Sequence, residues 1–202
     1  GLKNLFISII MVTAMFMGGT FSAMNILGEK EDGTILVNDV LPRSRLVYLF
    51  QKIAVGLLGG ILSAGLTALV CIRPLRMIQL PGLTAVILLS GFLASLAGAF
   101  TGRAAEGLMA GIGLLKLVML GFIAPPILFW LLLPAGSRGS GLACLVPSVP
   151  AFRGIMEPLE GGSFPAVYIL LLSVHCVVWL AVYLWTEMAG EKKKRCKGGK
   201  LA

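Results

Sequence analysis

The sequence predicts an all-α integral membrane protein, a helical bundle that forms a single transmembrane domain over residues 1–202. The chain is 57% hydrophobic and 13% charged, with a mean hydropathy of +0.95, which is too apolar for an ordinary soluble domain. Five stretches are long and apolar enough for a helix to cross a bilayer core of about 30 Å. Helices are expected because they satisfy their own backbone hydrogen bonds in lipid. The predicted spans are 5–27, 46–72, 83–100, 108–133 and 164–185.

The first predicted span is followed by a polar loop, residues 28–45, with the run GEKEDGT at its start. Asp32 and Gly33 predict a turn, and Thr34 is placed to cap a short helix that Pro42 ends. Residues 35–41 of that helix are mostly apolar, so they are expected to rest on lipid or on a partner protein. The loop is therefore the most informative segment of the chain.

The second and third spans carry small residues at helix-packing spacing, and the start of the fourth does the same. Close contacts between helices are therefore expected, although glycine is common in membrane helices generally. The pairs are Gly56 with Gly60, Gly91 with Ser95, Ala94 with Gly98, and Gly107 with Gly111.

The fourth and fifth spans each contain one group that could line a translocation path. Lys116 lies within an apolar run, where an ionisable residue is costly, but it stands about two turns from the span's end and could reach the headgroups. We favour this second interpretation. His175, the single histidine, has no acidic or histidine neighbour at helical spacing, so a hydrogen bond between helices is expected rather than metal binding.

Two segments outside the spans complete the predicted organisation. Residues 134–163 combine an apolar run with Pro147 and Pro150 and are too short to span, so they predict either a re-entrant element or an ordinary surface loop. Residues 187–202 form a basic tail, which is attracted to anionic lipid.

Basic residues in alternate loops predict the orientation of the chain, because cytoplasmic loops are enriched in Lys and Arg. Eleven such residues fall on the side of the GEKEDGT loop and the C-terminal tail, against five on the other side. That loop and the C-terminus are therefore expected in the cytoplasm. Gly1 is then expected outside, which predicts one more span before it.

The run after the first span resembles the membrane subunits of type-2 ABC exporters. These carry an acidic-basic-acidic run, then Gly-Thr, a short helix, a proline, and a lysine before the next span. The resemblance implies six spans, a second permease subunit, and a coupling helix that docks on a cytoplasmic ATPase, which holds ATP and Mg²⁺. No cofactor is expected on this chain itself. The coupling residues it implies are Glu29, Lys30, Glu31, Asp32, Gly33, Thr34, Ile35, Leu36, Val37 and Pro42.

This sequence departs from the family pattern at one place, because Ile35, Leu36 and Val37 stand where a charged residue usually follows Gly-Thr. The predicted partner contact is correspondingly apolar. Further along, Glu106, Gly107 and the paired Pro125 and Pro126 are similar to the fluoroquinolone-type export permeases, although Gly102 stands where that subgroup commonly has Asn. The resemblance implies a prokaryotic plasma membrane and an efflux function.

Other classes of function are less consistent with the sequence. Its basic residues crowd beside apolar runs, so they indicate topology and lipid contact rather than nucleic-acid binding. No phosphate-binding G-x-x-x-x-G-K-[ST] run is present, and the four cysteines form no C-x-x-C pair. No metal site is therefore expected. No enzyme activity is expected either, because the sequence offers no pair of catalytic groups at membrane depth. The alternative is a polytopic membrane component without transport activity, such as an assembly or immunity protein.

Overall fold

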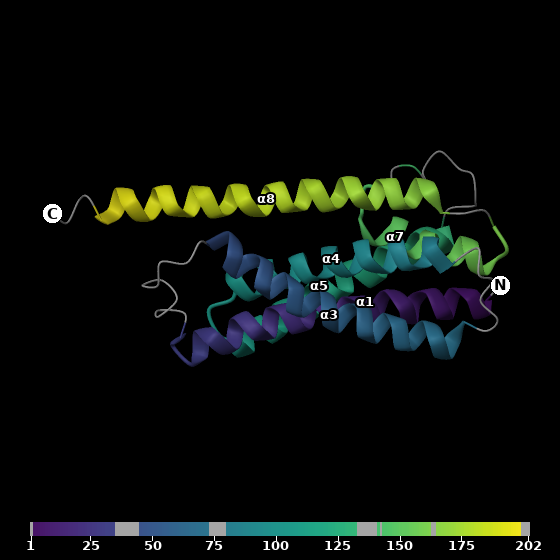
Figure 1. Ribbon diagram of the computed structural model, residues 1–202, viewed down its shortest axis with the longest axis horizontal. Coiled ribbons are helices and arrows are strands. Elements are labelled where there is room, and N and C mark those ends of the chain that lie inside the picture. The colour runs from purple at the N-terminus through teal and green to yellow at the C-terminus, as the bar shows by residue number, and fades with distance from the viewer. Residues whose placement is uncertain are drawn as a thin grey trace.

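The computed structural model describes the backbone of residues 2–34, 45–72, 80–132, 141, 143–162 and 165–198, with side chains except at 45, 46 and 187–198. Most of these residues are helical, and none of them forms a strand. Five helices are long and apolar enough to cross a membrane, so the predicted bundle of five spans is confirmed. They lie along one axis (Figure 1): α1 (Leu2–Glu31), α3 (Arg45–Cys71), α4 (Leu80–Ala104), α5 (Leu108–Leu132) and α8 (Ala166–Gly198).

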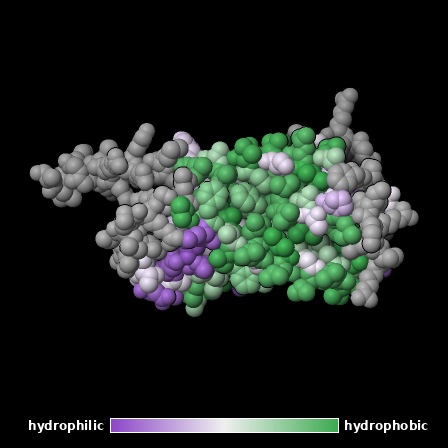
Figure 2. All heavy atoms as spheres, viewed as in Figure 1, coloured by the Kyte–Doolittle hydropathy of each residue, from purple (hydrophilic) through white to green (hydrophobic). Residues whose placement is uncertain are grey.

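Neighbouring helices run in opposite directions, so their ends gather at two opposite ends of the bundle (Figure 1). α1 and α4 finish, and α3 and α5 begin, at one end, which we call the charged end. It is defined by Glu29, Lys30, Glu31, Lys52 and Arg103. Figure 2 shows polar surface at this end and an apolar surface over the middle of the bundle. This pattern is the one expected of a protein whose middle contacts lipid.

α1 packs extensively against both α3 and α4, which also contact each other. Glycines allow the backbones to approach closely. A Cβ built on Gly98 of α4 would lie 1.9 Å from the carbonyl oxygen of Gly19, and one built on Gly56 of α3 would lie 2.6 Å from that of Gly18. Small residues at such crossings let dispersion forces act between whole helices, which is how helices associate in lipid. These crossings fix α1 against both neighbours.

α5 is much less enclosed than α4. In the most apolar window of each helix, 61% of α4 is buried inside the protein, against 11% of α5. α5 packs through one narrow face, where Gly111, Leu115 and Pro126 are buried and Phe122 contacts Phe16 of α1 with ring centroids 5.5 Å apart. Most of its surface is therefore available to lipid or to another protein.

Two helices extend beyond their predicted spans. α1 continues through Glu31, whereas the sequence placed residues 28–31 in the polar loop. The helix persists because the charged side chains of its last turn all find partners within the protein, as described below. α8 likewise continues to Gly198, so the predicted tail begins as a helix.

The sequence between the fourth and fifth spans contains the short helix α7 (Ser148–Leu159), at the end of the bundle opposite the charged end (Figure 1). Nine of its residues are buried, and it contacts α1, α4, α5 and α8. Asn4 of α1 donates a hydrogen bond from Nδ2 to the Leu159 carbonyl oxygen, 3.1 Å away, and so caps the end of α7. Such burial is not that of an ordinary surface loop. Whether this segment re-enters the membrane stays a prediction.

Candidate functional site at the charged end

The candidate site is the last turn of α1, where three consecutive charged residues precede a tight turn. Gly33 has φ +69°, a left-handed conformation that ends a helix at little cost only for glycine. The Asp32 and Gly33 N–H groups donate to the carbonyls of Gly28 and Lys30, at 2.9 and 3.3 Å. The predicted turn at Asp32 and Gly33 is confirmed, and it separates α1 from the loop that follows.

Glu29 connects α1 to α3 through a partly buried ion pair. Its Oε1 lies 2.5 Å from Nζ of Lys52, and its Oε2 accepts a hydrogen bond of 2.7 Å from the Tyr48 hydroxyl. Lys52 Nζ also donates to the side-chain oxygen of Asn25. The Lys52 side chain is only 9% exposed, and a cation this buried needs such partners. Ser22 adds a hydrogen bond of 3.2 Å to the Lys52 carbonyl.

Lys30 connects α1 to the end of α4. Its Nζ donates hydrogen bonds to the carbonyl oxygens of Arg103 and Ala105, at 2.7 and 2.6 Å. The last carbonyls of a helix have no partner within it, and together they carry a partial negative charge. A lysine is therefore a suitable cap for the C-terminal end of α4.

Glu31 connects α1 to the start of α5. Its Oε1 accepts a hydrogen bond of 3.2 Å from the backbone N–H of Leu108, the first residue of that helix. A carboxylate at this position satisfies a free N–H group and complements the partial positive charge of a helix N-terminus. The positive Lys30 therefore meets the C-terminal end of α4, and the negative Glu31 meets the N-terminal end of α5.

Three consecutive side chains thus hold three different helices. Glu29 reaches α3, Lys30 reaches α4 and Glu31 reaches α5. One helical turn of α1 consequently ties together the ends of all three neighbours at the charged end, and the short loop between α4 and α5 is held from both sides. A displacement of this turn would be transmitted to each helix.

Glu29, Glu31 and Asp32 are the acids expected to face the cytoplasm within the predicted coupling set. Glu29 and Glu31, with Lys30 between them, bind within the bundle, although Glu31 remains exposed, as does Asp32. Their role in coupling stays a prediction. The Thr34 hydroxyl donates to the Glu29 carbonyl at 3.2 Å. Ile35, Leu36, Val37 and Pro42 lie outside the described residues, as does the predicted short helix, so their role stays a prediction.

Sequence reasoning missed the partners of these charges. The lysine that the family resemblance expects before the second span is Lys52, but no partner was predicted for it, and neither Asn25 nor Tyr48 was singled out. Asn25 lies four residues before Glu29 and Tyr48 four before Lys52, so both pairs share a helix face. The available signal was the presence of a polar side chain, Asn25 or Tyr48, one turn inside an otherwise apolar span.

His175 joins α8 to the segment that precedes α7. Its Nε2 lies 3.0 Å from the Leu145 carbonyl oxygen, and its Nδ1 lies 2.8 Å from the Leu171 carbonyl of its own helix. A groove of about 500 Å³ runs along α8 beside this contact. Leu145 lies in a turn, so this contact differs from the hydrogen bond between helices that was expected. A role of His175 in a translocation path stays a prediction.

The side chain of Lys116 is exposed on α5, as are those of Leu117 and Leu120, whereas the neighbouring Leu115 is buried. Lys116 therefore lies outside the packing interface of α5. This position is compatible both with a translocation path between subunits and with a lysine side chain that extends to the lipid headgroups.

Neither a metal cluster nor an activated Cys144 thiol is found among the described residues. They contain no group of three His, Cys, Asp or Glu side chains able to hold a metal ion. Burial raises the pKa of the Cys144 thiol, and the nearby Arg153 cation opposes this only in part. A thiol with a raised pKa is a poor nucleophile at neutral pH.

Comparison with known protein families gives a match over most of the chain. The family model described as "ABC-2 family transporter protein" matches residues 1–185, which include all five predicted spans and the candidate site. Searches of curated proteins and of solved structures gave no significant match.

Proposed function

Because the chain belongs to the ABC-2 family of transporter proteins, we propose that it is the permease subunit of an ATP-driven exporter, coupled to a separate ATPase. Family membership makes it an integral membrane component of an ABC transporter. The direction of transport, the ATPase, a second permease subunit and a prokaryotic plasma membrane belong to the proposal. So do the cytoplasmic position of the charged end and the assignment of ATP and Mg²⁺ to the partner.

The observation that carries the proposal is the way Glu29, Lys30 and Glu31 distribute their contacts over α3, α4 and α5. An ATPase that pushes on residues 35–41 would act directly on the turn that follows Glu31. That turn would carry the three helix ends with it, because a hydrogen-bonded ion pair and two capped helix ends resist separation. The membrane helices would then move together rather than one at a time.

α5 is the helix best placed to respond to such a movement. It is the least enclosed of the five spans and packs only through a narrow face against α1, α4 and α7, so its displacement disrupts few contacts. Its exposed face, with Lys116, is our candidate wall of the translocation path. A second permease subunit would complete that path.

Purification from native cells under mild detergent tests the proposal most directly. The unmodified chain is expected to co-purify with an ATPase, and Leu36→Asp is expected to lose it, because a buried apolar contact does not accommodate an unpaired charge. Leu36→Met is the matched control and should retain the ATPase. Failure of the unmodified chain to recover any ATPase would favour the polytopic membrane component without transport activity.

Spin labels at the exposed positions Asp32 and Met109 test the link between α1 and α5. With the four native cysteines replaced by alanine, the distance between the labels is expected to be narrowly distributed and unaffected by MgATP in the complete transporter. Glu31→Ala should broaden it, because it removes the acceptor of the Leu108 N–H at the start of α5, and the loss of a charged cap costs about 1 kcal/mol. Glu106→Ala, which removes an exposed acid from the loop between α4 and α5, is the control. An unchanged distribution in Glu31→Ala would contradict the proposed coupling.

A further inference from the structure

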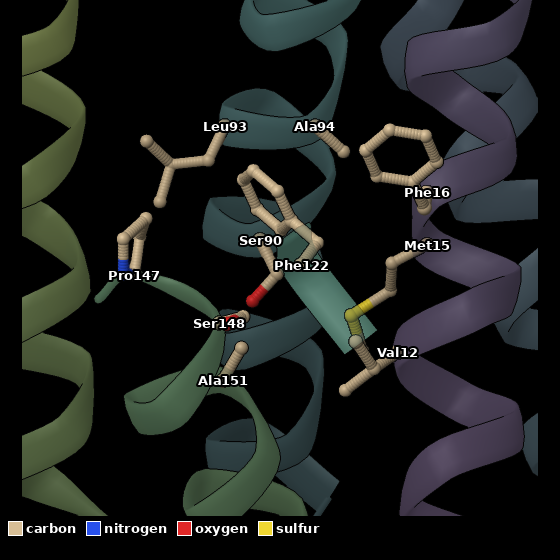
Figure 3. A pocket seen from close by; sticks show the side chains of 10 residues that line it. All are labelled: Val12, Met15, Phe16, Ser90, Leu93, Ala94, Phe122, Pro147, Ser148 and Ala151. Atoms are coloured by element: carbon tan, nitrogen blue, oxygen red, sulfur yellow. The ribbon is translucent and has the colours of Figure 1, made fainter. Parts of the chain in front are cut away.

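A small cavity lies between α1, α4, α5 and the start of α7 (Figure 3). We propose that it binds one water molecule, held between the hydroxyls of Ser90 on α4 and Ser148 on α7. Figure 3 shows both side chains at the cavity, with Phe122 of α5 and Met15 of α1 among the apolar groups around them. The water would join the N-terminal end of α7 to the buried helix α4.

The two hydroxyls are the reason to expect a bound molecule. Ser90 is 7% exposed and Ser148 is 1% exposed, and neither Oγ has a hydrogen-bond partner among the described residues. Buried polar groups are almost always hydrogen-bonded, because a buried group without a partner has lost its hydrogen bonds to water and has formed none within the protein. Ser148 is not used as a helix cap either, since Pro147 occupies that position and makes no side-chain cap.

The size and polarity of the cavity identify the ligand as water. Its volume is about 10 Å³, and a space of roughly 10–15 Å³ with two or more polar partners is what one buried water requires. A transported molecule would be far too large. Each hydroxyl can both donate and accept, so the pair provides the partners that a water needs. The positive end of α7 also favours a water oxygen at this position.

The position of this water gives it a structural consequence. Apart from the two serines, the wall is apolar, and Phe122 comes from α5, the least enclosed helix of the bundle. A water between Ser90 and Ser148 would hold the start of α7 to α4 independently of α5. The inference does not depend on the proposed transport function.

X-ray radiolysis of the purified protein tests for this water, because radicals formed from a bound water oxidise the side chains beside it. Met15 lines the cavity and is 2% exposed, whereas Met11, one turn earlier on α1, is 0% exposed and does not line it. Sulfoxide formation at Met15 is expected to exceed that at Met11 several-fold. In the Ser90→Ala/Ser148→Ala variant it should fall to the level of Met11. Equal oxidation of both methionines in the unmodified protein would overturn the proposal.

Thermal unfolding gives an independent test with a matched control. Ser8 of α1 is 0% exposed and its hydroxyl also has no partner among the described residues, but it does not line the cavity. Ser90→Ala and Ser148→Ala are each expected to lower Tm by about 2–4 °C. The double variant is expected to lower Tm by less than the sum of the two, because the loss of the first hydroxyl already weakens the binding of the water. Ser8→Ala should leave Tm unchanged or raise it. A rise in Tm for the cavity variants, as for Ser8→Ala, would show that no water binds.

Discussion

Gly98→Ala is expected to destabilise the bundle by about 3 kcal/mol or more and to lower strongly the yield of monodisperse protein in detergent. The added Cβ would lie 1.9 Å from the Gly19 carbonyl oxygen and 2.7 Å from its Cα. Both neighbours are backbone atoms in the middle of α1, so neither can move aside as a flexible side chain would. The helices must separate instead, and every contact along the α1–α4 crossing weakens with them.

The measurement is the Tm of the purified variant, together with its elution profile. Gly113→Ala and Gly121→Ala on α5 are the controls, because a Cβ at either position would meet nothing within 4 Å. Alanine also favours the helix over glycine by up to about 1 kcal/mol, so the controls should match or exceed the unmodified Tm. If Gly98→Ala were as stable as these controls, the close crossing of α1 and α4 would be wrong.

Glu29→Leu is expected to destabilise the protein by about 3 kcal/mol, because it removes the carboxylate from a buried lysine and leaves that charge unpaired. The Tyr48 hydroxyl loses its acceptor in the same variant. Asn25 would still accept a hydrogen bond from Lys52, which sets the expectation at the lower end of the range for broken buried pairs. Chemical unfolding in mixed micelles, followed by circular dichroism, measures the loss.

The double variant Glu29→Leu/Lys52→Met separates the ion pair from the rest of the site. Replacing both charges removes the unpaired cation, so the double variant should be more stable than Glu29→Leu alone. Asp32→Asn, an exposed acid beyond the last turn, should have little effect. A double variant that loses as much stability as the sum of the two single variants would show that Glu29 and Lys52 do not interact.

The sequence predicted the spans well because each depends on local composition. A run of some twenty apolar residues has few stable alternatives to a helix in lipid, so length and hydropathy predicted five spans with ends within a few residues. The turn at Asp32 and Gly33 was predicted for the same reason, since glycine relieves a local steric constraint. The end of α1 was predicted too early, because consecutive charged residues are typical of a loop when their partners within the protein are unknown.

Small-residue spacing was a less complete guide. Gly56, Gly60 and Gly98 do lie at close helix crossings, but Gly107 meets nothing within 4 Å. Gly18 and Gly19, the glycines that α3 and α4 approach, were not singled out at all. A spacing rule considers one helix at a time. A close crossing depends instead on small residues of two helices lying at the same level along the bundle axis.

The sequence by itself therefore determined the class of protein, the five membrane spans, the likeness to type-2 ABC exporters and the position of the charged turn. Only the tertiary structure decided what that turn does. Glu29, Lys30 and Glu31 are consecutive in the chain, but their partners lie on α3, α4 and α5, up to 77 residues away. Hydropathy and turn chemistry act over a few residues, whereas the partner of a charge depends on which helix ends the packed backbones bring together.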